Sequence, residues 1–158
     1  MDNDKKGEYM SYSKLYFHFI FRTKYNLPAI DIMYERELYA YMMGIIQNTS
    51  SKLLRIGGMP DHLHLAVEMN PQLSVSYFMQ QLKGSSSKWL GENPHFPMFR
   101  GWANGYAAFS FSKEGKNSIC AYIRQQKEHH RQTSFADEYR SILLDNECKI
   151  DERYFLKD

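Results

Sequence analysis

The sequence predicts an α+β fold, a ferredoxin-like βαββαβ arrangement in which an antiparallel sheet carries helices on one face. Two observations support this prediction. Apolar residues repeat with a period of two in some segments and with a helical period in others. In chain order these segments run strand, helix, strand, strand, helix, strand, followed by two more helices, and the first six are typical of that arrangement.

Strands are expected where apolar and polar side chains alternate, or where short apolar runs lie between turns. Residues 14–23 alternate in this way, and residues 62–69 do so again. The complete set of expected strands is 14–23, 53–57, 62–69 and 105–112. The expected helices are 31–48, 74–90, 116–131 and 134–147, and Asp31 is suited to cap the first of them.

Length and composition indicate one folded domain. Of the 158 residues, 43% are hydrophobic and 15% are aromatic, which argues against disorder. No apolar run approaches the roughly 20 residues of a membrane span, so no membrane partner is expected. We expect a leader at 1–12, one domain at 13–131, and a C-terminal helix with an acidic tail at 132–158. No secretory signal is visible, and Cys120 and Cys148 are expected to be reduced thiols, so a cytoplasmic protein is predicted.

Positive charge gathers in the middle of the chain. Residues 83–131 hold eight Lys or Arg and three Glu, although the whole chain carries a net charge of only +2. Such a segment favours a phosphate-bearing partner, and an ordinary solvated surface is the alternative. The basic residues expected to contact nucleic acid are Lys83, Lys88, Arg124, Lys127 and Arg131.

The strand at residues 62–69, HLHLAVEM, carries the first candidate site. Its apolar row should face the packing helices, so His62 and His64 should point to the opposite face of the sheet, as should His18 from the first strand. Same-face neighbours on a strand stand about 7 Å apart, so the two imidazoles can converge on one ion. The alternative is a pair of partly exposed histidines without a shared ligand.

A second candidate feature lies on the helix expected at 116–131. Tyr122 and Gln126 are four residues apart and therefore share one helix face. With His62 and His64, Gln126 would complete three neutral ligands for Mg²⁺ or Mn²⁺, and such an ion can polarise a phosphoryl oxygen beside the Tyr122 nucleophile. An ordinary half-buried tyrosine, one of twelve in the chain, is the alternative. His129 and His130 are expected to cap the helix end or face phosphate rather than bind the ion.

An ordered series of short motifs makes this sequence similar to the single-tyrosine HUH transposases of small single-stranded-DNA insertion sequences, including the REP-associated tyrosine transposases. The resemblance runs from about Ser13 to Arg131. The motifs, in order, are RTKY at 22–25, MPDHLHL at 59–65, SV at 74–75, LKG at 82–84, SSKW at 86–89, Trp102, GY at 105–106, and Tyr122-Ile123 followed by Gln126.

The resemblance implies the HUH endonuclease fold with a C-terminal catalytic-tyrosine helix, and residues 13–131 as the single-tyrosine transposase domain. It implies that His62 and His64 are the HUH pair, that Gln126 is the third metal ligand, and that Tyr122 forms a 5′-phosphotyrosine link and frees a 3′-OH. Relatives bind imperfect hairpins in single-stranded DNA and work as dimers, so hairpin DNA and a second copy of the chain are the expected partners. Whether the tyrosine serves its own chain or its partner stays open.

Two other functions fit the same residues. One is a REP-type hairpin-binding protein that does not transpose, and the other is a replication-initiator-like nickase using the same nick-and-join chemistry. Nickases of that kind usually carry further domains, for which 158 residues leave no room.

Overall fold

The computed structural model describes residues 11–158, so most of the expected leader at 1–12 lies outside the described residues. Four strands form one antiparallel sheet in the order β2-β3-β1-β4, as the βαββαβ prediction requires. The strands are β1 (Tyr16–Arg22), β2 (Lys52–Met59), β3 (His62–Glu68) and β4 (Ala107–Phe111).

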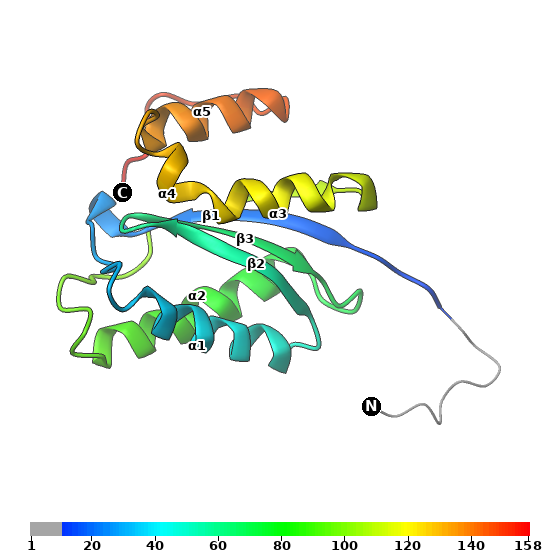
Figure 1. The fold of residues 1–158 in the computed structure, drawn as a ribbon, viewed down its shortest axis with the longest axis horizontal. Coiled ribbons are helices and arrows are strands. Elements are labelled where there is room, and N and C mark those ends of the chain that lie inside the picture. Colours follow the sequence, from blue (N-terminus) through cyan, green and yellow to red (C-terminus); the bar gives the residue numbers. More distant parts are fainter. Residues whose placement is uncertain (1–10) are drawn as a thin grey trace.

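Helices cover both faces of the sheet (Figure 1). One face carries α1 (Glu35–Asn48) and α2 (Val75–Glu92). The other carries α3 (Lys116–Arg124), α4 (Gln126–His129) and α5 (Phe135–Asp145). Two short 3₁₀ turns, η1 (Lys24–Asn26) and η2 (Lys113–Gly115), follow β1 and β4. Nothing in the described part of the chain forms a helix long and apolar enough to span a bilayer.

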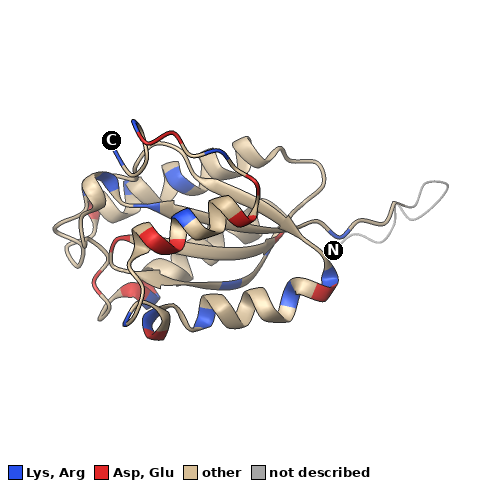
Figure 2. Ribbon diagram, turned by 90° about the horizontal axis from the view of Figure 1, so that it is seen from above, with Lys and Arg blue, Asp and Glu red and all other residues tan. Residues whose placement is uncertain are grey.

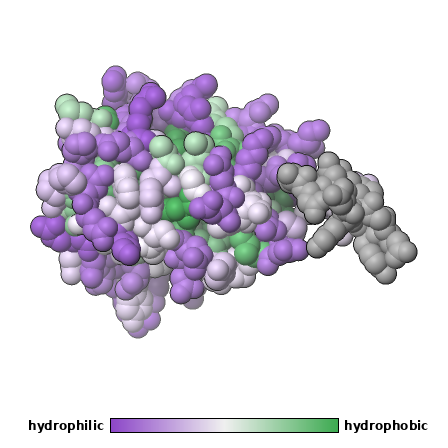
Figure 3. Space-filling view, turned by 90° about the horizontal axis from the view of Figure 1, so that it is seen from below, coloured by the Kyte–Doolittle hydropathy of each residue, from purple (hydrophilic) through white to green (hydrophobic). Residues whose placement is uncertain are grey.

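The hydrophobic core lies between the sheet and the α1–α2 layer. Leu63, Leu65 and Val67 of β3 point into it, together with Phe19 and Phe21 of β1. These residues alternate along their strands, so the intervening side chains point to the face covered by α3, α4 and α5. The outer surface of the α1–α2 layer is mostly hydrophilic, with apolar residues scattered over it (Figure 3).

The register of β1 against β3 positions the side chains of the second face. Arg22 pairs with His62 and Ile20 pairs with His64. His18 lies two residues further along the same face of β1, and it is buried. The centre of the sheet therefore presents a row of polar side chains to α3, α4 and α5.

Most observed element ends lie within two residues of the prediction, and two differences are larger. Asp31 does not cap α1: its side chain accepts a hydrogen bond from the Met33 N–H at 2.9 Å in a turn, and the helix begins four residues later at Glu35. The single helix expected at 116–131 is divided at Gln125, whose ψ of 17° falls outside the helical range. The break turns the chain after α3 and gives Gln126 a different direction from that of a continuous helix.

Gly57 allows β2 to approach α3 closely, because a Cβ at this position would lie 2.5 Å from the backbone oxygen of Ile123. We expect Gly57→Ala to push α3 away from the sheet and to destabilise the fold by about 1–3 kcal/mol. Thermal unfolding should then show a Tm lower by several degrees, on the order of 2–8 °C. The matched control is Gly44→Ala on α1, where a Cβ meets no atom within 4 Å. Equal Tm values for the two variants would contradict this close approach.

Candidate metal and nucleophile site

The predicted histidine pair lies on the sheet face covered by α3, α4 and α5. His62 and His64 are both 0% exposed, so the alternative of two partly exposed strand histidines does not apply. The intervening Leu63 points into the core on the opposite face. The strand alternation read from the sequence therefore gives the correct face for both imidazoles.

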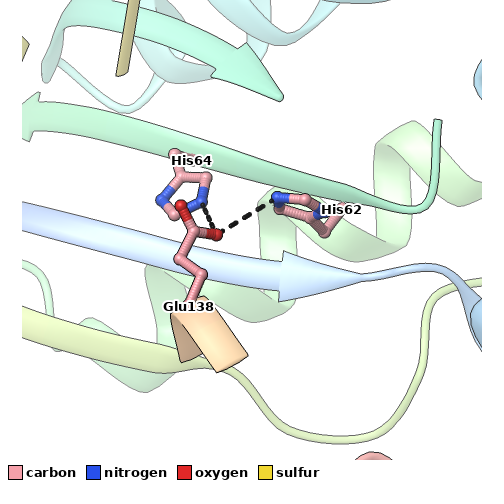
Figure 4. Close-up of side chains that lie close together, drawn as sticks. All are labelled: His62, His64 and Glu138. Atoms are coloured by element: carbon pink, nitrogen blue, oxygen red, sulfur yellow. Dashed lines mark hydrogen bonds and ion pairs between the residues drawn. The ribbon is translucent and has the colours of Figure 1, made fainter. Parts of the chain in front are cut away.

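Glu138 of α5 joins the two histidines, and the sequence analysis did not identify it. Its Oε1 lies 3.1 Å from His64 Nε2 and 3.5 Å from His62 Nε2 (Figure 4). One ligand atom from each of the three residues lies within 4.8 Å of the other two. Adjacent ligand atoms bound to one ion at about 2.1 Å in octahedral geometry stand about 3.0 Å apart, and the separations of 3.1 and 3.5 Å from Glu138 are near that spacing.

The position of Glu138 on its helix carries a signal that the sequence does contain. Ser134 caps α5 through a hydrogen bond from the Asp137 N–H, and the positions of Phe135, Glu138 and Ile142 share one face of the helix. Among the residues of α5, all of them described, Glu138 alone is buried. A carboxylate on the inward, apolar face of a helix is the pattern that marks it as a candidate ligand.

Asp61 orients His62. The Nδ1 of His62 lies 2.8 Å from Asp61 Oδ1, and because an ionised carboxylate can only accept, Nδ1 carries the proton. Burial lowers the pKa of His62, but hydrogen bonds with Asp61 and Glu138 outweigh burial and raise the pKa above its ordinary value. When His62 is neutral, its Nε2 presents a lone pair toward Glu138, which is the orientation a metal ligand needs.

His18 supports His64 in the same way. His18 Nε2 lies 2.9 Å from His64 Nδ1, and the two rings stack at 5.1 Å. Burial and the neighbouring His64 lower the pKa of His18 to about 3, and burial lowers the pKa of His64 to about 4. Both rings are therefore neutral near pH 7. A neutral His64 carries one proton, which its Nε2 donates to the Glu138 carboxylate, so Nδ1 accepts from His18 Nε2. An ion bound at Nε2 would take the place of that proton, and Nδ1 would then donate to His18.

Glu138 supplies a fixed negative charge. Burial acts to raise the pKa of this carboxyl, but hydrogen bonds from His130, His62 and His64 outweigh burial and hold the pKa far below its usual range. The carboxylate is therefore ionised at neutral pH, although its residue is only 3% exposed. A buried anion among ring nitrogens favours a bound cation, and the chemistry of the donor set fits a divalent ion.

Tyr122 of α3 contacts the same carboxylate from the other side. Its hydroxyl donates a hydrogen bond to Glu138 Oε2, and its ring lies 5.7 Å from the ring of His64. Burial and the hydrogen bond to Glu138 raise the pKa of Tyr122 above its ordinary value. The phenol is therefore protonated at neutral pH, and both the histidines and the tyrosine of this arrangement belong to one chain.

Gln126, His129 and His130 also belong to the cluster, and His129 Nε2 lies 3.4 Å from Glu138 Oε2. Gln126 Oε1 lies 3.2 Å from His62 Nε2, and its Nε2 donates to Glu138 Oε2 at 2.9 Å. The side chain of the predicted third ligand therefore lies at the site, beside His62, whereas the Glu138 carboxylate lies within 3.5 Å of both histidines. His130, expected at the helix end or facing phosphate, instead contacts Glu138 Oε1 at 3.1 Å and Gln126 Oε1 at 3.0 Å.

The five basic residues expected to contact nucleic acid have different surroundings. Lys83 donates to the carbonyls of Ala103 and Gly105, and Lys127 pairs with Glu35, so both side chains hold parts of the fold together. Arg131 pairs with Glu128 at the surface, and Lys88 and Arg124 are exposed. Positive and negative residues are interspersed over the ribbon rather than separated into two regions (Figure 2). The role of these five residues in binding stays a prediction.

The sheet order, the paired histidines and the adjacent tyrosine define an HUH-type fold of the kind found in single-tyrosine transposases. A REP-associated tyrosine transposase bound to a REP hairpin superposes with a TM-score of 0.59 at 12% identity, covering 78% of this chain and 74% of that one. A crystal structure from Deinococcus radiodurans R1, of a protein inferred to be a transposase, gives a TM-score of 0.56 at 28% identity, with coverage of 77% and 97%.

The chain belongs to the IS200-like transposase family. The sequence pattern of that family matches residues 11–126 of the chain. The transposase for insertion sequence element IS200 from Salmonella typhimurium is 30% identical over 119 residues, covering 71% of this chain and 76% of the relative. The ISDra2 transposase TnpA from Deinococcus radiodurans is 24% identical over 131 residues, covering 78% and 91%. The family match ends at Gln126, so α5 and its Glu138 lie outside it.

Proposed function

We propose that this transposase-family protein binds hairpins in single-stranded DNA, cleaves the adjoining strand through a 5′-phosphotyrosine intermediate, and rejoins strands. The observation that supports this proposal is the convergence of the Tyr122 hydroxyl and the imidazoles of His62 and His64 on one buried carboxylate. A nucleophile and a cation site that share one group lie close enough to act on one phosphate.

The residues divide the chemistry between them. The Tyr122 oxygen gives up its proton and attacks phosphorus, the bond from phosphorus to the 3′ oxygen breaks, and that oxygen takes up one proton to become a free 3′-OH. Joining is the reverse reaction, in which a 3′-OH attacks the phosphotyrosine. Because its pKa is raised, Tyr122 is a weak nucleophile until a positive charge lies beside it. Bound Mg²⁺ or Mn²⁺ would supply that charge and polarise a phosphoryl oxygen.

The ligand set proposed for that ion is His62, His64 and an oxygen from Glu138 or Gln126. The imidazoles hold their Nε2 atoms toward the site because Asp61 and His18 occupy their Nδ1 atoms. A carboxylate oxygen makes the set suitable for hard cations, and the imidazoles favour Mn²⁺ over Mg²⁺ in vitro.

Hairpin DNA is the proposed substrate, supported by the fold neighbour that is bound to a REP hairpin. The homodimer expected from the sequence stays a prediction. The arrangement of one chain already brings Tyr122 beside its own histidines, so a site built within one chain is the simpler proposal.

Substrate form tests the proposal. We expect structured single strands to be cut and the fully paired duplex to resist, because pairing and stacking oppose the bending that would bring one phosphate to Tyr122. The experiment compares one sequence as top strand, bottom strand and annealed duplex, at fixed salt with Mn²⁺, on denaturing gels. Linear duplex cut as fast as either strand would overturn the proposal. Hairpin binding with no cleavage of any form would favour the hairpin-binding alternative.

A further inference from the structure

Arg22, at the end of β1, is a buried cation that the proposed chemistry does not use. Its side chain is 9% exposed, and it lies on the same sheet face as the histidines because it pairs with His62 across the β1–β3 ladder. Directly opposed residues on antiparallel strands have Cα atoms about 4.5–5.5 Å apart. The Arg22 side chain therefore extends from the strand next to the one that carries His62 and His64.

The hydrogen-bond acceptors of the Arg22 guanidinium come mainly from the C-terminal segment, residues 146–158. This segment leaves α5 and returns to the turn after β1 (Figure 1). Arg22 Nη1 lies 3.3 Å from Asp158 Oδ2, and Arg22 Nη2 donates to the Lys157 carbonyl at 2.9 Å. The Tyr25 N–H donates to the same Asp158 oxygen. Among the described residues, Asn26 Oδ1, at 3.0 Å, is the acceptor that Arg22 finds outside this segment.

We propose that Arg22 and the Tyr25 N–H form a binding site for a phosphodiester of single-stranded DNA, and that the Asp158 carboxylate occupies this site in the free protein. A carboxylate and a phosphodiester each present two acceptor oxygens and one negative charge, so the planar fork of an arginine binds either. The inference rests on the proposed function, because it adds a second phosphate contact beside the one at Tyr122.

Two further observations favour a phosphate site over a purely structural ion pair. Arg22 lies within the residues that match the transposase family, whereas Asp158 lies outside them. The space beside Arg22 is a cavity of about 300 Å³ whose walls include Tyr106, Phe135 and Tyr139, together with residues of the C-terminal segment itself. Aromatic walls beside a phosphate-binding cation suit a nucleotide, because the bases of single strands stack on such side chains.

The consequence is competition between the segment and DNA. A tethered carboxylate competes at an effective concentration on the order of millimolar. The substitution Asp158→Asn removes the charge and keeps the size of the side chain, so the Arg22 site becomes available to DNA. We expect hairpin DNA with a single-stranded extension to bind this variant about fivefold more tightly than the wild type. One additional phosphate contact should also steepen the salt dependence of binding, log K against log salt, by about 0.7.

The experiment measures binding by fluorescence anisotropy with EDTA present, so that no cleavage intervenes. The matched control is Glu147→Gln, which removes the same charge from the same segment at an exposed residue that does not line the Arg22 cavity. The double variant Arg22→Gln with Asp158→Asn should lose the gain in affinity. Equal affinity and equal salt dependence for the two single variants, or no DNA binding by either, would overturn the inference without any need for the Arg22 variant to fold.

This readout separates the two proposals. A protein that binds more tightly after Asp158→Asn but never forms a tyrosine adduct would overturn the proposed cleavage and leave the phosphate site supported. A protein that cleaves through Tyr122 while Asp158→Asn binds like Glu147→Gln would overturn the phosphate site alone.

Discussion

Replacing Tyr122 with phenylalanine is expected to abolish the covalent protein–DNA adduct and to reduce cleavage by on the order of 10³-fold or more. The change removes one oxygen, the proposed nucleophile, and retains the ring that packs against His64 and His18. Glu138 Oε2 keeps its hydrogen bond from Gln126, so the cluster should persist. Labelled single-stranded hairpin DNA, resolved on a denaturing gel after incubation with Mn²⁺, reports the adduct directly.

The matched control is Tyr106→Phe, which makes the same change at a tyrosine 37% exposed in the wall of the Arg22 cavity. Hairpin affinity should be nearly unchanged in both variants, which separates a loss of chemistry from a loss of folding. An adduct that persists in Tyr122→Phe and disappears in Tyr106→Phe would make Tyr106, just before β4, the nucleophile and refute the proposed mechanism.

His64→Ala is expected to remove metal-dependent cleavage, because it deletes a proposed ligand from the centre of the site. Isothermal titration with Mn²⁺ should show at least a tenfold loss of affinity, on the scale of the 10–100-fold losses that follow even from removing the groups that orient a ligand. His95→Ala is the control, since His95 stacks on Tyr34 at the surface, away from the cluster. Full cleavage in EDTA by the wild type, or by His64→Ala with Mn²⁺, would contradict the metal assignment.

The same titration distinguishes Glu138 from Gln126 as the oxygen ligand. Glu138→Gln removes the anion and should weaken Mn²⁺ binding more than Gln126→Ala if the carboxylate is the ligand.

The affinity for Mn²⁺ should also increase as pH rises, because His62 has a raised pKa and must lose a proton before its Nε2 can bind an ion.

The strand part of the site could be predicted from the sequence because a strand has one simple rule. Alternation along β3 determines that His62 and His64 share a face, and no tertiary information is needed for that conclusion. The same rule applied to β1 predicted the position of His18. The order of elements likewise predicted the antiparallel sheet, because βαββαβ chains have few ways to bury both helices on one face.

The helical part could be predicted less well. The spacing of Tyr122 and Gln126 assumed a continuous helix, whereas Gln125 interrupts it, and only the packing of the chain determines such a break. Glu138 is 74 residues from His64 in the sequence. Whether the Glu138 carboxylate reaches the histidines therefore depends on how α5 docks on the sheet, and no local sequence pattern determines that. The signal that the sequence holds for Glu138 is its position on the apolar face of the helix expected at 134–147.

The docking of α5 has a thermodynamic consequence. Because its one buried residue is a carboxylate that faces the histidines, this helix is attached through the polar site more than through the core. Any ion that takes Glu138 as a ligand binds the state in which α5 is docked, so ion binding and helix docking stabilise one another by the same free energy. The ion would therefore stabilise the docked position of α5, which lies outside the family match. Loss of the ion would weaken the docking of this helix, which also leads to the C-terminal segment that binds Arg22.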